Sequence, residues 1–347
     1  MMRRFGSSRA WAIARGWCLW VLVAVGGCAA GEESTPREET VAREDAPPRV
    51  EALDPAFEAL VASNAEIEVL AEGHGWTEGP VWVPELGGLL YSDIPANSIF
   101  LHRDGVGATS WLGPTDDDAS GSGASNGLIL DADGRLLLAQ HGDRRIARLD
   151  APWAAPRPAY VTLVDTFDGA RFNSPNDLVQ GPGGDLYFTD PPYGLAGGDD
   201  DPARELTVNG VYRRTPAGEV ELVDDRLVRP NGVILSPDGR TLYVASSDPS
   251  QPFVYAYSVE PDGSIGARRV FAGAMGDGMA VDRDGNVWVA EPLRGVYVFD
   301  PEGRHLGSIL TGQRTSNVAW GDDGSSLYIT AASYLMRVRT EAVGAGF

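Results

Sequence analysis

Six short motifs that recur along the chain each open on a side chain with oxygen donors. The opening residue is a glutamate, an aspartate or an asparagine, and a short apolar run follows it, usually after one glycine. These opening residues are Glu78, Asn126, Asn176, Asn231, Asp277 and Asn317. Hard cations prefer carboxylate and carboxamide oxygens. If the fold brings these side chains together, they can hold one divalent cation, with Ca²⁺ expected first and Mg²⁺, Mn²⁺ or Zn²⁺ as alternatives.

The segments around these residues repeat one pattern. Their starts lie between 40 and 55 residues apart. In each copy the apolar run leads through a glycine-bearing turn into a second apolar stretch, as in 126–130, 131–134 and 136–139. Apolar runs across such a turn indicate a β-hairpin. Six units of this length predict an all-β fold, a six-bladed β-propeller. We expect residues 67–70 to supply the last strand of the sixth blade and close the ring.

The propeller prediction places the opening residues together. The innermost strand of each blade lines the central tunnel, so the six side chains are expected to form a polar ring at one end of it. Two of the six are ionised, Glu78 and Asp277, which leaves positions for water or substrate. The alternative is that these side chains cap strands or bond to one another, as asparagines at loop-to-strand junctions often do. An unrelated β-sandwich is the alternative fold, but sandwiches do not repeat one start motif six times.

Charge and the amino-terminal pattern limit the partners. The formal net charge of −21 over 347 residues repels phosphate backbones, so nucleic-acid binding is not expected. An arginine-rich start leads into an apolar run over 17–25, which is too short to span a bilayer. Small residues then precede Cys28, as in a bacterial lipoprotein signal, with an ordinary cleaved export signal as the alternative. The pattern predicts export to the periplasmic side, with the membrane joined only through a lipid on Cys28, and the protein is expected to be a monomer.

Composition also suggests the domain boundaries. Residues 1–27 are expected to be the signal peptide, and residues 28–65, which are acidic and proline-containing, a flexible tether. The propeller is then expected to occupy residues 66–347. The aspartate runs at 116–118 and 199–201 are interpreted as solvated loops, one of which can cover the tunnel mouth.

The amino-acid sequences of these motifs resemble those of a known family. Segments 78–82, 91–95, 171–177, 188–194, 229–232 and 277–279 resemble the SMP-30/gluconolactonase family, in its bacterial gluconolactonase branch. The resemblance runs in order through all six copies, over about residues 66–340. It implies an enzyme that depends on calcium or another divalent metal and hydrolyses sugar lactones such as gluconolactone to the aldonic acid.

The resemblance also implies roles for single residues. Glu78, Asn231 and Asp277 correspond to metal ligands, and Asn176 to an asparagine beside the metal that contacts it or the substrate. Asp277 is in addition the candidate general base. Asn126 and Asn317 are expected to complete the polar wall, with Asn126 facing the substrate.

At the remaining candidate substrate contacts, this sequence matches the family pattern less closely. The animal members of the family carry an arginine where this chain has Ser174, so Arg171 is the residue expected to reach the substrate instead. His141 can orient a lactone hydroxyl or shuttle a proton, and Tyr193 is a further candidate contact. A surface or packing role is the alternative for His141, Tyr193 and Asp190.

Two other functions can be weighed on the sequence. Residues 123–127 match the G-x-S-x-G nucleophile pattern, but that motif needs a strand before it and a helix after it, and a second strand is predicted to follow here. The second alternative is a non-catalytic exported propeller that binds a carbohydrate or protein partner around a structural metal. A pure binding module has no need of both carboxylates on the tunnel axis, which favours the enzyme.

Overall fold

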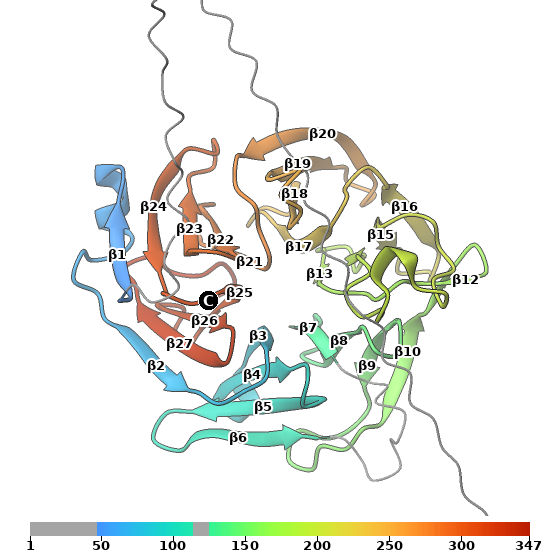
Figure 1. The fold of residues 1–347 in the computed structure, drawn as a ribbon, viewed down its shortest axis with the longest axis horizontal. Coiled ribbons are helices and arrows are strands. Elements are labelled where there is room, and N and C mark those ends of the chain that lie inside the picture. Colours follow the sequence, from blue (N-terminus) through green and yellow to red (C-terminus); the bar gives the residue numbers. More distant parts are fainter. Residues whose placement is uncertain (1–46, 114–124) are drawn as a thin grey trace, which may run out of the picture. The chain divides into compact units, whose positions relative to one another are not determined.

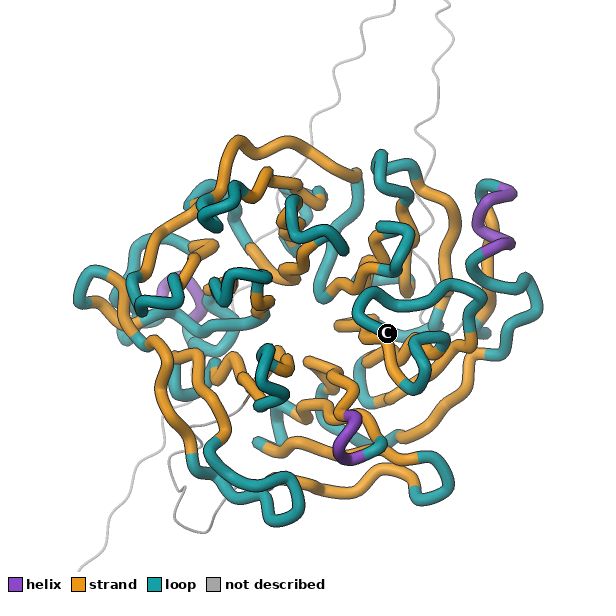
Figure 2. Tube along the Cα trace, turned by 180° about the vertical axis from the view of Figure 1, so that it is seen from behind, coloured by secondary structure: helices purple, strands orange, loops and turns teal. Residues whose placement is uncertain are grey.

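The fold is seen in a computed structural model that describes residues 47–113 and 125–347. Six antiparallel sheets are arranged around a common centre (Figure 1), and Figure 2 shows the same ring from behind. The first strands of the sheets, β3, β7, β13, β17, β21 and β25, contact their neighbours around the centre. The predicted all-β, six-bladed β-propeller is confirmed.

Blades one to three follow the chain without crossovers. Blade one contains β3 (Thr77–Val83), β4 (Gly88–Asp93), β5 (Ser98–Arg103) and β6 (Gly107–Leu112), with the 3-10 helix η2 (Pro84–Leu86) in its first turn. Blade two contains β7 (Ser125–Leu130), β8 (Leu136–Gln140), β9 (Arg145–Leu149) and β10 (Tyr160–Val164). Blade three contains β13 (Leu178–Gln180), β14 (Leu186–Asp190), β15 (Gly210–Arg214) and β16 (Val220–Asp224). A hairpin of β11 (Thr166–Phe167) and β12 (Ala170–Arg171) precedes blade three, and η3 (Gly198–Asp200) lies within it.

Blade four also follows the chain, whereas blades five and six each include a strand from the amino-terminal part of the described chain. Blade four contains β17 (Pro230–Leu235), β18 (Thr241–Ser246), β19 (Val254–Val259) and β20 (Ile265–Ala272). Blade five contains β21 (Met279–Val281), β22 (Val287–Glu291), β23 (Gly295–Phe299) and β24 (His305–Leu310), with β1 (Arg49–Ala52) at its outer edge. Blade six contains β25 (Thr315–Gly321), β26 (Ser326–Ala331) and β27 (Tyr334–Arg339), and β2 (Ile67–Ala71) is its fourth strand. Because β2 pairs with β27, from Ile67 opposite Val338 onward, the expected closure of the ring is confirmed.

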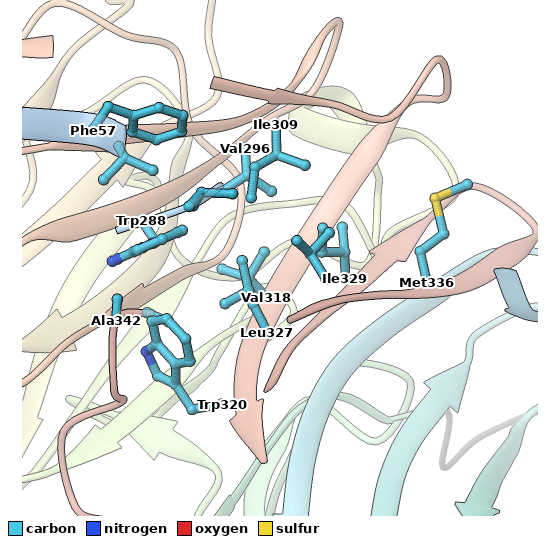
Figure 3. Packing of buried hydrophobic residues seen from close by; sticks show 14 of the residues in the cluster. Phe57, Trp288, Val296, Ile309, Val318, Trp320, Leu327, Ile329, Met336 and Ala342 are labelled. Atoms are coloured by element: carbon cyan, nitrogen blue, oxygen red, sulfur yellow. The ribbon is translucent and has the colours of Figure 1, made fainter. Parts of the chain in front are cut away.

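The expected tether to residue 65 is wrong at its carboxyl end. Strand β1 pairs with β24, with Val50 opposite Ile309, and the 3-10 helix η1 (Pro55–Ala59) follows it. Phe57 of η1 is completely buried in a hydrophobic cluster that also contains Trp288. Figure 3 shows Phe57 on one side of that cluster. The few apolar side chains of this segment are therefore enough to fix it, although its average composition is that of a tether.

Aspartates in the hairpin turns explain why the strands end where they do. The Oδ1 of Asp131 accepts the backbone N–H groups of Asp133 (3.0 Å) and Arg135 (2.9 Å). Asp282 accepts those of Asp284 (3.1 Å) and Asn286 (2.8 Å) in the same way. A side chain that satisfies two backbone donors within its own turn stops the strand and reverses the chain.

Glycine follows four of the six opening residues because the first strands approach one another closely. A Cβ on Gly79 would lie 2.0 Å from the carbonyl oxygen of Asn126, and one on Gly232 would lie 2.1 Å from that of Asp277. The N–H of Gly232 donates to the same Asp277 oxygen at 3.0 Å. The Glu-Gly, Asn-Gly and Asp-Gly motifs are therefore needed to bring neighbouring blades together at the centre.

Gly232→Ala is expected to destabilise the protein by at least about 2 kcal/mol, because the new methyl group must displace the backbone of blade five. Gly273→Ala is the control, since nothing lies within 4 Å of its added Cβ, and its effect is expected to stay within about 0.5 kcal/mol. Urea unfolding followed by circular dichroism measures both. Equal stability of the two variants would contradict the packing argument.

Several predictions fall on residues outside the described ranges. These are the signal peptide over 1–27, Cys28, the first half of the tether, the aspartate run at 116–118 and the first part of the G-x-S-x-G match. In the described ranges, no helix is both long and apolar enough to cross a membrane.

Candidate functional site

A cavity of about 490 Å³ lies where the first strands of the blades converge. Two kinds of segment form its wall: residues at or just before the start of the first strands, and the loops that follow the second strands of blades one to five. The lining residues are Trp76, Glu78, Ile94, Asn126, His141, Asn176, Tyr193, Asn231, Ser247, Pro249, Met275, Asp277, Pro292, Leu293 and Arg314. The propeller thus brings five of the six opening residues to one cavity.

The sixth opening residue lies apart from them. Asn317 lines a separate cavity of about 430 Å³, together with the apolar residues of the first strands. Its Nδ2 donates to Glu78 Oε2 at 3.4 Å, and its Oδ1 accepts the N–H of Val318 at 2.8 Å. Asn317 therefore supports Glu78 and does not share its cavity, which corrects the expectation of a single six-membered ring.

Two carboxylates define the electrostatics of the cavity. Glu78 is 3 % exposed, and its Oε2 accepts the N–H of Gly79 at 3.2 Å. Burial is the main cause that raises the pKa of Glu78 to about 7. Burial and the neighbouring Glu78 carboxylate raise the pKa of Asp277 well above its usual range. Asp177, which lines the separate cavity, raises both pKa values further, and burial raises its own pKa to about 7.

The oxygen donors near Glu78 and Asp277 are of the kind that a divalent cation binds. Among the described residues, neither Glu78 nor Asp277 forms an ion pair with an arginine. The Glu78 carboxylate raises the pKa of Asp277, and the charge of Arg314 opposes that rise only in part. Asn176 and Asn231 add carboxamide oxygens and are 4 % and 3 % exposed. No group of three or more His, Cys, Asp or Glu side chains able to hold a metal occurs in the described ranges. A site here must therefore combine carboxylates with carboxamides, which is a donor set that suits Ca²⁺.

Asn231 is oriented by a short polar chain. Its Nδ2 donates to Ser247 Oγ at 3.2 Å, and that hydroxyl is 2.5 Å from the Tyr193 hydroxyl. Because Nδ2 is the donor, Oδ1 is the atom of Asn231 that can serve a cation. Tyr193 itself is 48 % exposed, so it lies at the mouth of the cavity.

The structure places one of the predicted substrate contacts, Arg171, outside the cavity. Arg171 is exposed and is not among the lining residues; its guanidinium donates to the carbonyl oxygen of Asp143 at 2.8 Å. Ser174 is 1 % exposed, and its hydroxyl donates to the Pro191 carbonyl oxygen at 2.6 Å. Arg171 therefore does not line the cavity in this structure, and its contact with the substrate stays a prediction. The predicted contacts Asn126, His141 and Tyr193 do line the cavity.

An arginine that the sequence argument missed lines the cavity instead. Arg314 lies over the Trp76 ring, with 5.1 Å between its Cζ atom and the ring centroid. The indole N–H of Trp76 in turn donates to Glu78 Oε1 at 3.4 Å. Arg314 is the one cationic side chain among the lining residues of this cavity. Position is the signal that could have found it, since Trp76, Met275 and Arg314 all lie two or three residues before an opening residue.

A comparison with models of known protein families shows which family the chain belongs to. Residues 76–333 match the family model described as the SMP-30/Gluconolactonase/LRE-like region. The chain belongs to this family. That range holds every residue lining the cavity, from Trp76 to Arg314.

Individual members of the SMP-30/gluconolactonase family cover most of the chain. A gluconolactonase of Zymomonas mobilis subsp. mobilis is 36 % identical, over 85 % of this chain and 87 % of its own length. The pentonolactonase XacC of Haloferax volcanii is 28 % identical, over 74 % of this chain and 81 % of its own. The solved structure of a gluconolactonase from Xanthomonas campestris superposes with a TM-score of 0.74 and 32 % identity, covering 85 % of this chain and 95 % of that one.

Proposed function

We propose that this chain hydrolyses a sugar lactone of the gluconolactone type to the aldonic acid, with the help of one divalent cation. The observation that carries the proposal is the convergence of Glu78 and Asp277 with Asn176 and Asn231 in one cavity. Relatives named gluconolactonase and pentonolactonase support the lactone as substrate class. A non-catalytic binding module has no such support among these relatives.

In this proposal Glu78, Asn231 and Asp277 hold the cation, and Asn176 lies between it and the substrate. The oxygen-only donor set favours Ca²⁺. When bound, the cation supplies Lewis acidity for the lactone carbonyl.

Asp277 is proposed as the general base. Its carboxylate takes one proton from the attacking water, and the water oxygen bonds to the carbonyl carbon. The bond between that carbon and the ring oxygen then breaks, and the ring oxygen takes the proton held by Asp277 and becomes a hydroxyl group, which restores the carboxylate. Because burial raises the pKa of Asp277, its carboxylate is more basic than an exposed aspartate, although a bound cation opposes that rise.

The other lining residues are proposed to orient the sugar hydroxyls. Asn126 offers both a donor and an acceptor. Burial lowers the pKa of His141 to about 4, so its imidazole is neutral near neutral pH and can orient a hydroxyl without adding charge. This favours the orienting role of His141 over a proton shuttle. Tyr193, at the mouth, can contact the end of the substrate far from the scissile bond.

Hydrolysis of glucono-1,5-lactone by the purified protein tests the proposal. The rate above spontaneous hydrolysis is measured after chelation and again after adding Ca²⁺, Mg²⁺, Mn²⁺ or Zn²⁺ in turn. We expect chelation to abolish the enzymatic rate and one of these cations, Ca²⁺ first, to restore it. A protein that binds the cation but accelerates hydrolysis of neither gluconolactones nor pentonolactones would instead support the binding module.

Arg314→Gln is expected to raise KM for glucono-1,5-lactone by about tenfold, because a charged hydrogen bond to a substrate hydroxyl contributes about 1.4 kcal/mol or more. Arg269→Gln is the matched control: Arg269 also stacks on an aromatic ring, that of Phe271 at 5.9 Å, but on strand β20. Initial-rate kinetics at saturating cation measure both variants. An unchanged KM in Arg314→Gln would remove Arg314 from the substrate site.

Export and lipid anchoring are also proposed, on the sequence pattern alone. A protein lipidated at Cys28 is expected in the membrane fraction, and Cys28→Ser is expected to move it to the soluble fraction. Wild-type protein found wholly in the soluble fraction would contradict the anchor. The purified chain is proposed to be a monomer, which light scattering after size-exclusion chromatography measures directly.

A further inference from the structure

Two buried aspartates outside the cavity occupy equivalent places in blades one and three. Asp93 is the last residue of β4, and Asp190 is the last residue of β14. Asp93 is 4 % exposed and Asp190 is fully buried. Neither lines the cavity, and the proposed chemistry uses neither of them.

Each aspartate holds the segment that leads into the first strand of its own blade. Asp190 accepts the backbone N–H of Asn173 on Oδ2 and that of Ser174 on Oδ1, both at 2.7 Å. Asp93 accepts the N–H of Gly75 at 3.1 Å and that of Trp76 at 3.3 Å. In both blades a single carboxylate therefore binds two successive backbone donors.

In both blades, the residues whose N–H groups the aspartate binds precede an opening residue of the cavity by the same number of positions. Gly75 and Trp76 lie three and two residues before Glu78, and Asn173 and Ser174 lie three and two residues before Asn176. We call residues 75–76 and 173–174 the lead-in segments. Because only one residue separates each lead-in segment from the opening residue, a shift of the segment must move that side chain as well.

The other blades lack this arrangement among the described residues. The last residues of the second strands there are Gln140, Ser246, Glu291 and Ala331. In blade four the N–H of Ser247 donates to the Arg229 carbonyl oxygen at 3.0 Å, and the N–H of Gly276, before blade five, donates to the Ser246 carbonyl oxygen at 3.1 Å. Backbone bonds therefore fix the approaches to Asn231 and Asp277, whereas carboxylates fix the approaches to Glu78 and Asn176.

We infer that Asp93 and Asp190 are positioning residues of the active site, Asp93 for Glu78 and Asp190 for Asn176. The inference rests on the proposed function in assigning Glu78 to the cation and Asn176 to the boundary between cation and substrate. It predicts different consequences for the two aspartates. Loss of the Asp93 contacts affects mainly cation binding, and loss of the Asp190 contacts affects mainly turnover.

Asp93→Asn and Asp190→Asn test the inference in the full chain. An asparagine replaces one acceptor oxygen by an N–H₂ group that faces a backbone N–H. Asp190→Asn therefore loses the bond to Asn173 or the bond to Ser174. Asp93→Asn loses the charge and at least the contact of one oxygen with Gly75, whose N–H lies 3.2 Å from Oδ1 and 3.1 Å from Oδ2. We expect Asp93→Asn to weaken Ca²⁺ binding by about tenfold in calorimetry, the size typical of changes beside a ligand. Asp190→Asn is expected to lower kcat by about tenfold at saturating Ca²⁺ and to change Ca²⁺ affinity less than Asp93→Asn does.

Asp300→Asn is the matched control. Asp300 is 7 % exposed and also accepts two backbone N–H groups, from Glu302 at 3.1 Å and Arg304 at 2.8 Å. It does so in a hairpin turn between β23 and β24, away from the cavity. We expect this variant to lose stability while keeping Ca²⁺ affinity and kcat. If Asp190→Asn does not fold, Asp190→Ser is the second variant, since Ser246 occupies the same place in blade four.

Crystal structures of the two variants complete the test without depending on activity. Movement of the Glu78 side chain in Asp93→Asn, and of Asn176 in Asp190→Asn, is the expected result. Variants that match Asp300→Asn in stability loss, with Glu78 and Asn176 unmoved and with Ca²⁺ affinity and kcat within about twofold of wild type, would overturn the inference. Wild-type protein without cation binding or lactone hydrolysis would refute the proposed function alone, because the two crystal structures still decide whether the aspartates position these side chains.

Discussion

Replacing Asp277 by asparagine is expected to lower kcat/KM for glucono-1,5-lactone by about a hundredfold to ten-thousandfold, the range for loss of a general base. The substitution keeps the size of the side chain and removes its charge. It leaves Glu78 as the single carboxylate among the lining residues of the cavity, so Ca²⁺ affinity is expected to fall as well, by at least about tenfold.

Two measurements separate the roles of Asp277 as ligand and as base. Calorimetry gives the Ca²⁺ affinity, and kinetics at saturating Ca²⁺ then gives the rate that remains once the site is filled. A rate that recovers at saturation indicates a ligand, and a rate that stays low indicates a base. Asp282→Asn is the control, because Asp282 is a buried aspartate of the same blade that bonds to Asn286 and Trp288 and does not line the cavity. An Asp277→Asn variant that binds Ca²⁺ and hydrolyses the lactone at the wild-type rate would contradict both roles.

The arrangement of the blades could be predicted because the sequence repeats the contacts that build them. Gly79 and Gly232 mark the close approach of neighbouring first strands, and turn aspartates such as Asp131 mark the hairpins. Both signals are local, so they can be read without knowing the fold. Once six copies are recognised, propeller geometry brings Glu78 and Asp277 to one cavity although 198 positions separate them in the chain.

Features that depend on single contacts between distant segments could not be predicted in this way. Phe57 fixes η1 by packing beside Trp288, but its neighbours in sequence have the composition of a linker. Arg314 reaches the cavity because Trp76 of the adjoining blade supports it. Arg171 has a sequence position that predicts the same role, yet its guanidinium bonds to the Asp143 carbonyl oxygen. Side-chain direction at the ends of loops is set by such partners and not by spacing.

In the presence of a chelator, the protein is expected to become less stable as the pH rises from about 5 to about 8. Burial raises the pKa of Glu78 from 4.5 to about 7, so between these values the folded state keeps a proton that the unfolded state has released. Stability falls with pH wherever the folded state binds more protons. For Glu78 alone the loss is on the order of 3 kcal/mol, and Asp177, with its pKa raised to about 7, acts in the same direction.

Calcium is expected to reverse this loss of stability with rising pH. It binds the ionised carboxylates, whose burial without a cation destabilises the folded protein. The stabilisation that a ligand gives grows with its concentration relative to Kd, and ionisation of Glu78 lowers Kd as the pH rises. The gain in Tm on adding Ca²⁺ is therefore expected to be larger at about pH 7.5 than at about pH 5.5. Glu78→Gln removes the titrating group, so its chelated form should lose less stability over the same interval than the wild type. Identical pH dependence in the two proteins would show that Glu78 does not carry the pH-dependent loss of stability, and the destabilised carboxylates would then be Asp277 and Asp177, whose pKa values burial also raises.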